Sequence, residues 1–312
     1  MTTYRTALVT YPHTQPLKDS TVAPRTFAFA FEEVSPIIKA IRRMVRGLEF
    51  DISEMAITTY LTAKAHGKPF TAIPVFPMRA FHHGAILYNT TSNIRSPKDL
   101  EGKKVGVNRG YTVTTGLWAR AILQHEYGVD LNRITWVLSG DEHVAEYRPP
   151  SNVVPAPEGR TLEEMLLAGE LAAANGVQMD SPDIAPLLPD AKNAGLNGLR
   201  AGGLYPINHT IVVRDDLLAA HPELAADLFD AFVRAKQVYV NRLKSGAIAD
   251  PTPADKTFAA VTAITGDPLP YGVAPNRREI DAVIQYSVEQ GILPKPFRVD
   301  EVFASGTLEL AG

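Results

Sequence analysis

The residues best suited to chemistry stand together in residues 71–89, TAIPVFPMRAFHHGAILYN, where a polar loop separates two apolar runs. The loop carries Arg79, His82 and His83. A guanidinium binds a carboxylate bidentately, and an imidazole can take or give a proton near neutral pH. Loops at the ends of buried strands are where α/β proteins place ligands. We therefore expect these three side chains to face a bound acid, with a solvated surface loop as the alternative.

Ser53 and Glu54 stand where a predicted strand over residues 49–55 meets a helix. Side chains at such a junction face the same space as the free N–H groups of the helix. A charge that only complements the helix dipole is the alternative for Glu54. His13 follows the first predicted strand, residues 6–11, and faces either a ligand or solvent.

A second polar loop joins the predicted strand 103–107 to a helix that runs to about Tyr127. Unpaired N–H groups and the helix dipole together form a cradle for a carboxylate or phosphate. The loop lacks the spacing of a Walker or GxGxxG motif, so nucleotide binding has little support. The candidate ligand-binding residues here are Asn108, Arg109, Tyr111 and Thr112.

The second half of the chain adds three candidates. Asn208 and His209 lead into a strong predicted strand, residues 209–213, which we interpret as the return of the chain to its first lobe. Tyr271 lies in a turn-rich loop, residues 267–276. We include Asn208 and Tyr271 as ligand-binding residues and His209 as an acid–base residue.

Composition excludes several classes of function. The chain has 312 residues, a net charge of −3 and no cysteine. Its length predicts two domains, and its charge balance argues against a nucleic-acid partner. Without cysteine there are no disulfides, thiolate metal sites or cysteine nucleophiles. No apolar run approaches the ~20 residues that cross a bilayer, and the N-terminus does not read as a signal peptide, so we expect a cytoplasmic protein without a membrane partner.

Strands and helices alternate along the chain, which predicts a three-layer α/β fold. The predicted helices include one that begins with a capping box of Thr161 and Glu164 and a long one over residues 222–244. The order of parts resembles a type II periplasmic-binding-protein fold, with SPKDLEGKKVGV opening the second lobe. This resemblance implies two three-layer α/β lobes joined by a two-strand hinge, with a ligand cleft between them. It places lobe I at residues 1–92 and 206–312, and lobe II at residues 93–205.

Within that fold the sequence is similar to the 4,5-dihydroxyphthalate decarboxylase family. The matching stretches are FDISEMAITTYL, IPVFPMRAFHHGAILYN, DLEGKKVGVNRGYTVTTGLWARAILQHEYGV, GGLYPINHTIVVRDDL and DPLPYGVAPNRREIDAVIQYSVEQGILP. The resemblance implies non-oxidative decarboxylation of a hydroxylated aromatic dicarboxylic acid by a homo-oligomer. The sequence departs from the family pattern at His82-His83-Gly84, at residues 169–173 and at residues 144–159, which leaves a related acid open as substrate.

Such a reaction needs a cation for a carboxylate, a base for a ring hydroxyl and an acid for the ring carbon. Arg79 is the expected clamp, and Arg109 with the following helix offers a second anion site. His83 and His209 are the expected acid–base groups, with His82 in reserve. Glu54 serves as the acid if a closed cleft raises its pKa.

Two other functions were weighed. A non-catalytic solute-binding protein for a small aromatic carboxylate would use the same cleft. A pyrimidine-precursor synthase of the related thiamin-pathway group relies on a cysteine-rich segment that this chain lacks. We expect no cofactor, because no lysine stands out for pyridoxal phosphate. A divalent metal remains an alternative, held by His82, His83, His209 and Glu54, although no HExxH motif is present.

Overall fold

The computed structural model describes residues 1–312, except for the side chain of Lys192. The chain divides into two compact units, which we describe separately. Unit 1 comprises Met1–Arg79, Ile207–Ala282 and Phe297–Gly312, and unit 2 comprises Ala80–Pro206 and Val283–Pro296. Residues 80–92 and 283–296, expected in lobe I, thus group with unit 2. For residues 80–92 the physical reason is strand pairing, because β5 (Ile86–Asn89) bonds to strands of unit 2. A cleft between the lobes stays a prediction.

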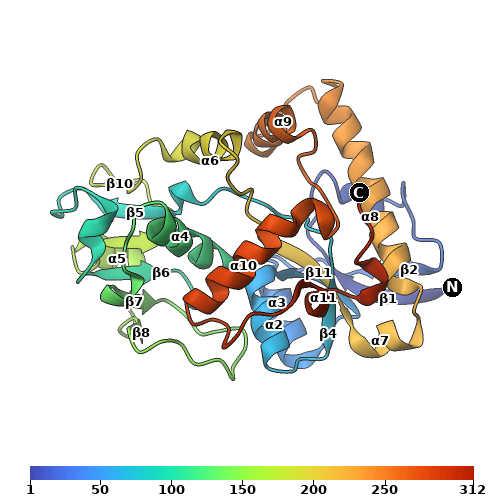
Figure 1. The fold of residues 1–312 in the computed structure, drawn as a ribbon, viewed down its shortest axis with the longest axis horizontal. Coiled ribbons are helices and arrows are strands. Elements are labelled where there is room, and N and C mark those ends of the chain that lie inside the picture. Colours follow the sequence, from blue (N-terminus) through green and yellow to red (C-terminus); the bar gives the residue numbers. More distant parts are fainter. The chain divides into compact units, whose positions relative to one another are not determined.

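The sheet of unit 1 has the strand order β2-β1-β3-β11-β4 (Figure 1). Its strands are β1 (Thr2–Ala7), β2 (Phe27–Phe31), β3 (Ile52–Ala56), β4 (Phe70–Ile73) and β11 (His209–Arg214). β1 pairs in parallel with β2 and β3, whereas β11 lies antiparallel between β3 and β4. Ile211 lies opposite Glu54, so His209, two residues earlier, is a diagonal neighbour of Glu54 on the same face.

Helices surround this sheet. They are α1 (Gln15–Lys18), α2 (Ile38–Gly47), α3 (Ile57–Ala65), α7 (Asp215–Ala220), α8 (Leu224–Lys244), α9 (Pro253–Thr265) and α11 (Val299–Val302). α2 buries Ala40, Ile41, Met44 and Val45 at helical spacing and packs on β3. α3 is buried on nearly every side, which fixes the strand-to-helix junction below Glu54.

Unit 2 contains a sheet with the order β10-β5-β9-β6-β7-β8. Besides β5, its strands are β6 (Lys104–Val107), β7 (Thr135–Leu138), β8 (Val153–Pro155), β9 (Ala173–Asn175) and β10 (Ile184–Pro186). Its helices are α4 (Thr114–His125), α5 (Leu162–Leu167), α6 (Ala191–Arg200) and the second half of α10 (Arg277–Glu289). Gly106 in β6 is tightly enclosed, because a Cβ there would lie 3.0–3.2 Å from Leu171, Leu162 and Ala174.

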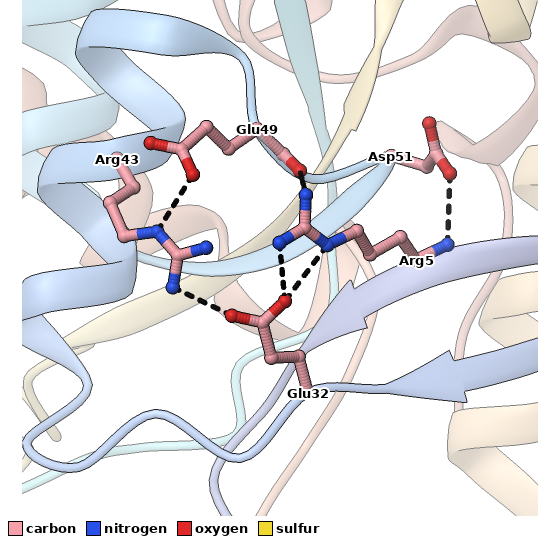
Figure 2. A network of polar contacts seen from close by, with 5 residues as sticks. All are labelled: Arg5, Glu32, Arg43, Glu49 and Asp51. Carbon is pink, nitrogen blue, oxygen red and sulfur yellow. Dashed lines mark hydrogen bonds and ion pairs between the residues drawn. The ribbon is translucent and has the colours of Figure 1, made fainter.

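An ion-pair network joins β1, α2 and the residue after β2 at the edge of the sheet in unit 1 (Figure 2). Glu32, just after β2, accepts from Arg5 of β1 at 2.8 Å and from Arg43 of α2 at 2.7 Å. Arg43 also reaches Glu49 at 2.9 Å, and the backbone N–H of Arg5 donates to Asp51 at 2.8 Å. These side chains are partly exposed, so salt screens their charges, and we attribute to them alignment of β1, β2 and α2 more than stability.

Several sequence expectations are confirmed and others shift. The expected capping box of α5 is present, with reciprocal bonds between Thr161 and Glu164 of 3.1 and 3.2 Å. The first strand was expected to reach Tyr11 but ends at Ala7, because the chain then turns so that the N–H of Val9 donates to Glu54. None of the helices in the described structure combines the length and hydropathy that crossing a bilayer requires.

Candidate active site

Glu54 is the centre of a polar cluster inside unit 1. Its side chain is fully buried on β3. One carboxylate oxygen accepts from the Nδ1 of His209 at 2.6 Å and from the hydroxyl of Tyr11 at 2.8 Å. The other accepts from the backbone N–H of Val9 at 3.0 Å. A buried carboxylate with this many donors is held in one orientation and compensated for the loss of water.

These contacts set the ionisation of Glu54. Burial alone would raise its pKa, but the hydrogen bonds and charge of His209, with the bonds from Val9 and Tyr11, hold the pKa below its usual value. Glu54 is therefore a carboxylate near neutral pH. The expected role of Glu54 as an acid with a raised pKa is corrected on this ground.

His209 has the geometry of an acid–base group. Its Nδ1 faces Glu54, which fixes the orientation and tautomer of the ring. Within the described residues its Nε2 has no hydrogen-bond partner, and the side chain keeps 13% of its surface exposed. A carboxylate behind one nitrogen and a free, accessible second nitrogen form the arrangement that moves protons in hydrolases with a Ser-His-Asp triad.

Sequence reasoning missed Tyr11 and misplaced His13. The two rings stack with centroids 5.1 Å apart, and the Nε2 of His13 donates to the carbonyl of Pro77 at 2.9 Å. Burial lowers the pKa of His13 to about 4, so the ring is neutral at pH 7. His13 is buried behind Tyr11, and we correct its expected role from ligand contact to support of that ring. Nothing in the sequence pointed to Tyr11, because it is the last residue of the predicted first strand.

Arg79 lies in the same unit and is held by a residue that we did not anticipate. Its Nη2 bonds to the side-chain oxygen of Asn276. The amide nitrogen of Asn276 in turn donates to the carbonyls of Pro270 and Gly272 at 3.0 and 2.7 Å. Tyr271 lies inside this turn, fully buried. Burial raises its pKa, Asp267 and Glu54 add to the rise, and Arg79 opposes it. Arg79 and Glu54 therefore both lie within electrostatic reach of Tyr271.

Two other expected ligand contacts in unit 1 prove to be buried. The hydroxyl of Ser53 donates to the backbone carbonyl of Glu54 at 2.9 Å, so it braces β3. Asn208 is almost completely buried, and its carbonyl accepts from the first N–H of α3 at Ile57. Ser53 is therefore a structural residue, and Asn208 supports the turn that leads into His209.

The expected anion cradle in unit 2 exists, but the chain fills it with its own carboxylate. Glu142 bonds to the N–H of Tyr111, to the N–H of Thr112 at 3.2 Å and to the hydroxyl of Thr112 at 2.6 Å. A Cβ at Gly110 would overlap this carboxylate, which explains the glycine. We therefore correct the expectation that Tyr111 and Thr112 are open to a ligand.

Asn108 and Arg109 differ in whether the side chain can still bind a ligand. The amide of Asn108 is used at both ends, because it donates to Gly176 at 2.8 Å and accepts from Ser139 at 3.2 Å. Arg109 has a left-handed backbone with φ of 73°, which is unusual for a side chain of this size. The residue as a whole is exposed, partial burial lowers the pKa of its guanidinium, and that group makes no hydrogen bond or ion pair with the described residues. Arg109 is thus the accessible cation of this loop.

The two histidines of the first loop lie in unit 2. His82 is buried at the start of the short turn His83–Ala85. The Nε2 of His83 lies 3.1 Å from the carboxylate of Glu126, and its Nδ1 is buried without a partner among the described residues. The geometry does not favour the expected acid–base role of His83. Among the described side chains, no group of three or more His, Asp or Glu residues is placed to hold a metal ion.

Comparison with known proteins identifies the family. The protein-family model described as NMT1/THI5 like matches residues 48–147. A 4,5-dihydroxyphthalate decarboxylase of Comamonas testosteroni is 32% identical over 284 residues, covering 86% of this chain and 86% of that protein. The chain belongs to the 4,5-dihydroxyphthalate decarboxylase family. A second family member, from Pseudomonas putida, is 34% identical over 173 residues, covering 51% of this chain and 67% of that protein.

Solved structures confirm the fold expected from the sequence. The periplasmic aliphatic sulphonate binding protein SsuA of Escherichia coli superposes with a TM-score of 0.56 at 12% identity, covering 97% of this chain and 92% of that protein. At this identity the similarity shows a periplasmic-binding-protein-like fold and nothing about the ligand.

Proposed function

We propose that this protein is a carboxy-lyase that removes CO₂ from a hydroxylated aromatic dicarboxylic acid, 4,5-dihydroxyphthalate or a close analogue. The two family members named above carry that activity in their names. The observation that carries the proposal is the pair formed by the buried Glu54 carboxylate and His209, 2.6 Å apart, with the Nε2 of His209 left accessible.

The proposed step moves one proton and breaks one carbon–carbon bond. A ring hydroxyl of the substrate supplies electron density to the ring carbon that bears the leaving carboxylate. His209 gives its Nε2 proton to that carbon, and the electrons of the bond to the carboxylate return to the ring as CO₂ leaves. Glu54 stabilises the protonated imidazole before transfer and keeps Nε2, not Nδ1, turned to the substrate. No external oxidant or reductant is needed.

Substrate binding falls to the arginines in this proposal. Arg79 stands in the same unit as Glu54 and His209, and Arg109 is exposed at the end of β6. A planar guanidinium suits a carboxylate, and a dicarboxylic acid has one carboxylate to hold and one to lose. The proposal uses no cofactor. The absence of a cofactor, a homo-oligomeric assembly and a cytoplasmic location stay predictions, with a divalent metal as the alternative.

The direct test is CO₂ release by the purified protein. The wild type, before and after treatment with a chelator, is incubated with 4,5-dihydroxyphthalate and a panel of other hydroxylated aromatic acids. We expect release from at least one of them, and a loss only after chelation would add a metal. Release from none, combined with thermal stabilisation by one acid, would replace the proposal with a solute-binding protein.

A His209→Gln variant tests the assignment of the proton donor. General acid–base catalysis contributes about 10²–10⁴-fold, so turnover should fall by that range. The matched control is His83→Gln, which changes another imidazole held by a carboxylate, that of Glu126 at 3.1 Å. Turnover that survives in His209→Gln with an unchanged pH–rate profile would remove His209 from the reaction while leaving the decarboxylase proposal intact.

A further inference from the structure

A pocket apart from the candidate active site lies entirely within unit 2. It has a volume of about 200 Å³, and all its lining residues belong to unit 2. The rings of Phe81, Trp118 and Tyr286 line it, Trp118 from α4 and Tyr286 from the last turn of α10. An apolar cavity of about 150 Å³ holds benzene in another protein, so the space suffices for one substituted aromatic ring.

Glycines of α6 and of the segment after it leave this space open. Gly195 is explained by packing, because a Cβ there would overlap the ring of Phe81. Gly198 is not, since a Cβ there would have nothing within 4 Å. Glycine inside a helix is destabilising by about 0.5–1 kcal/mol relative to alanine. A ligand that fills the space beside Gly198 would give this residue a reason that packing does not supply.

The polar end of the pocket is acidic. Glu126 is the only fully charged side chain in the described lining, which contains no lysine or arginine. It accepts from the Nε2 of His83 at 3.1 Å. His125, also in the lining, stacks on Tyr286 with centroids 4.5 Å apart and places its Nε2 2.8 Å from Glu289. Two carboxylates therefore stand at or just behind this end.

Aromatic walls and nearby carboxylates favour one class of ligand. The faces of Trp, Tyr and Phe rings attract organic cations, and a carboxylate forms strong hydrogen bonds with a charged N–H group. An aromatic carboxylate would instead bring like charge to Glu126. The acids assigned above to the reaction are thus the wrong ligands for this pocket.

We propose that the pocket of unit 2 binds a protonated aromatic amine or amidine, with its ring between Phe81, Trp118 and Tyr286 and its charge at Glu126. This site goes beyond the proposed decarboxylase activity and does not depend on it. None of the residues to which we give a part in the reaction belongs to its lining.

Two probes of similar shape and opposite charge test the proposal. Benzamidine and benzoate are titrated into the wild type by calorimetry, and benzamidine should bind at least about tenfold more tightly, the effect of one charge-assisted hydrogen bond. The two tryptophans give the location by NMR. The indole N–H signal of Trp118 should shift with benzamidine, whereas that of Trp136, which is buried and donates to Leu131 at 3.2 Å, should not.

Two variants separate the pocket from the rest of the surface. Gly198→Leu fills the open space and should abolish benzamidine binding, while Asn197→Leu, exposed on the same helix and outside the lining, should leave it unchanged. Glu126→Gln should remove the preference for benzamidine over benzoate. Equal binding of the two probes, undiminished binding in Gly198→Leu, or no binding of benzamidine by the wild type would overturn the proposal. CO₂ release by the same variants should match the wild type, so the outcome is independent of the decarboxylase test.

Discussion

The Glu54→Gln substitution is the sharpest test of the site, because the Glu54 carboxylate accepts hydrogen bonds from His209, Tyr11 and Val9. An amide keeps one acceptor oxygen and turns the other into a donor. If the oxygen stays toward His209, the new NH₂ group meets the N–H of Val9, and an unmet buried donor destabilises by about 1–3 kcal/mol. His209 at the same time loses a charged partner worth about 1.5–3 kcal/mol, which corresponds to about ten- to 150-fold in turnover.

The same substitution should also change how the stability of the protein depends on pH below neutrality. The pKa of Glu54 is held below its usual value, so Glu54 adds stability above the unfolded-state pKa of about 4.3, and that contribution is lost as the pH falls through the lower folded-state pKa. The stability gap between wild type and Glu54→Gln, measured by denaturant unfolding, should therefore narrow below about pH 4.3. A gap that stays constant down to strongly acidic pH would contradict the hydrogen-bonded carboxylate.

The assay for the chemical effect is the initial rate of CO₂ release from 4,5-dihydroxyphthalate at saturating substrate. The matched control is Glu126→Gln, which makes the same change in another carboxylate–imidazole pair, His83 and Glu126. We expect the loss in Glu54→Gln alone. Equal turnover in the two variants, with both folded, would refute the assignment of the Glu54–His209 pair to the reaction.

Three further substitutions follow from the same contacts. Arg79→Ala should lower kcat/KM for a diacid by about ten- to 150-fold, by loss of a carboxylate contact, with kinetics on a monoacid as the comparison. Tyr11→Phe removes one donor to the charged Glu54 and should destabilise the protein by about 1.5–3 kcal/mol in urea unfolding. Burial and Glu54 raise the pKa of Tyr11, so this loss should not change between neutral pH and about pH 9. Glu142 accepts hydrogen bonds from the N–H of Tyr111 and from the N–H and hydroxyl of Thr112, and Glu142→Gln turns one of its two oxygens into an NH₂ group. At least one donor then loses its acceptor, so the free energy of unfolding in urea should fall by about 1–3 kcal/mol.

Much of the fold could be predicted from local pattern. The alternation of strands and helices, the long helix that ends at Lys244 and the strand after Asn208 all depend on apolar spacing that neighbours in sequence reveal. The end of the first strand could not be predicted, because TALVTY has strand propensity throughout. The chain leaves the sheet at Ala7 because the N–H of Val9 donates a hydrogen bond to Glu54, which is 45 residues later in the sequence.

The site divides in the same way. Glu54, His209 and Arg79, which the structure places in unit 1, were chosen as candidates by residue type and by their place at predicted strand ends. Their partners were not, since Tyr11 and Asn276 act through contacts that span 43 and 197 residues. A tyrosine after a strand and an asparagine before a helix have common local explanations, and nothing in the sequence distinguishes these two residues from ordinary examples.

The loop 108–112 shows why a local motif is an incomplete guide to a ligand site. Its N–H groups were correctly identified as an anion cradle, but an isolated loop does not reveal which anion it holds. Glu142 comes from a segment about 30 residues later and takes the cradle as part of the fold. Because those donors are already used, the positive charge that this loop can still offer is the partly buried guanidinium of Arg109, whose backbone N–H donates to the hydroxyl of Ser139 at 2.7 Å. Recognition of an acid by unit 2 should therefore depend on a side chain and not on the helix N-terminus, which shifts the expected loss of affinity from Thr112 to Arg109.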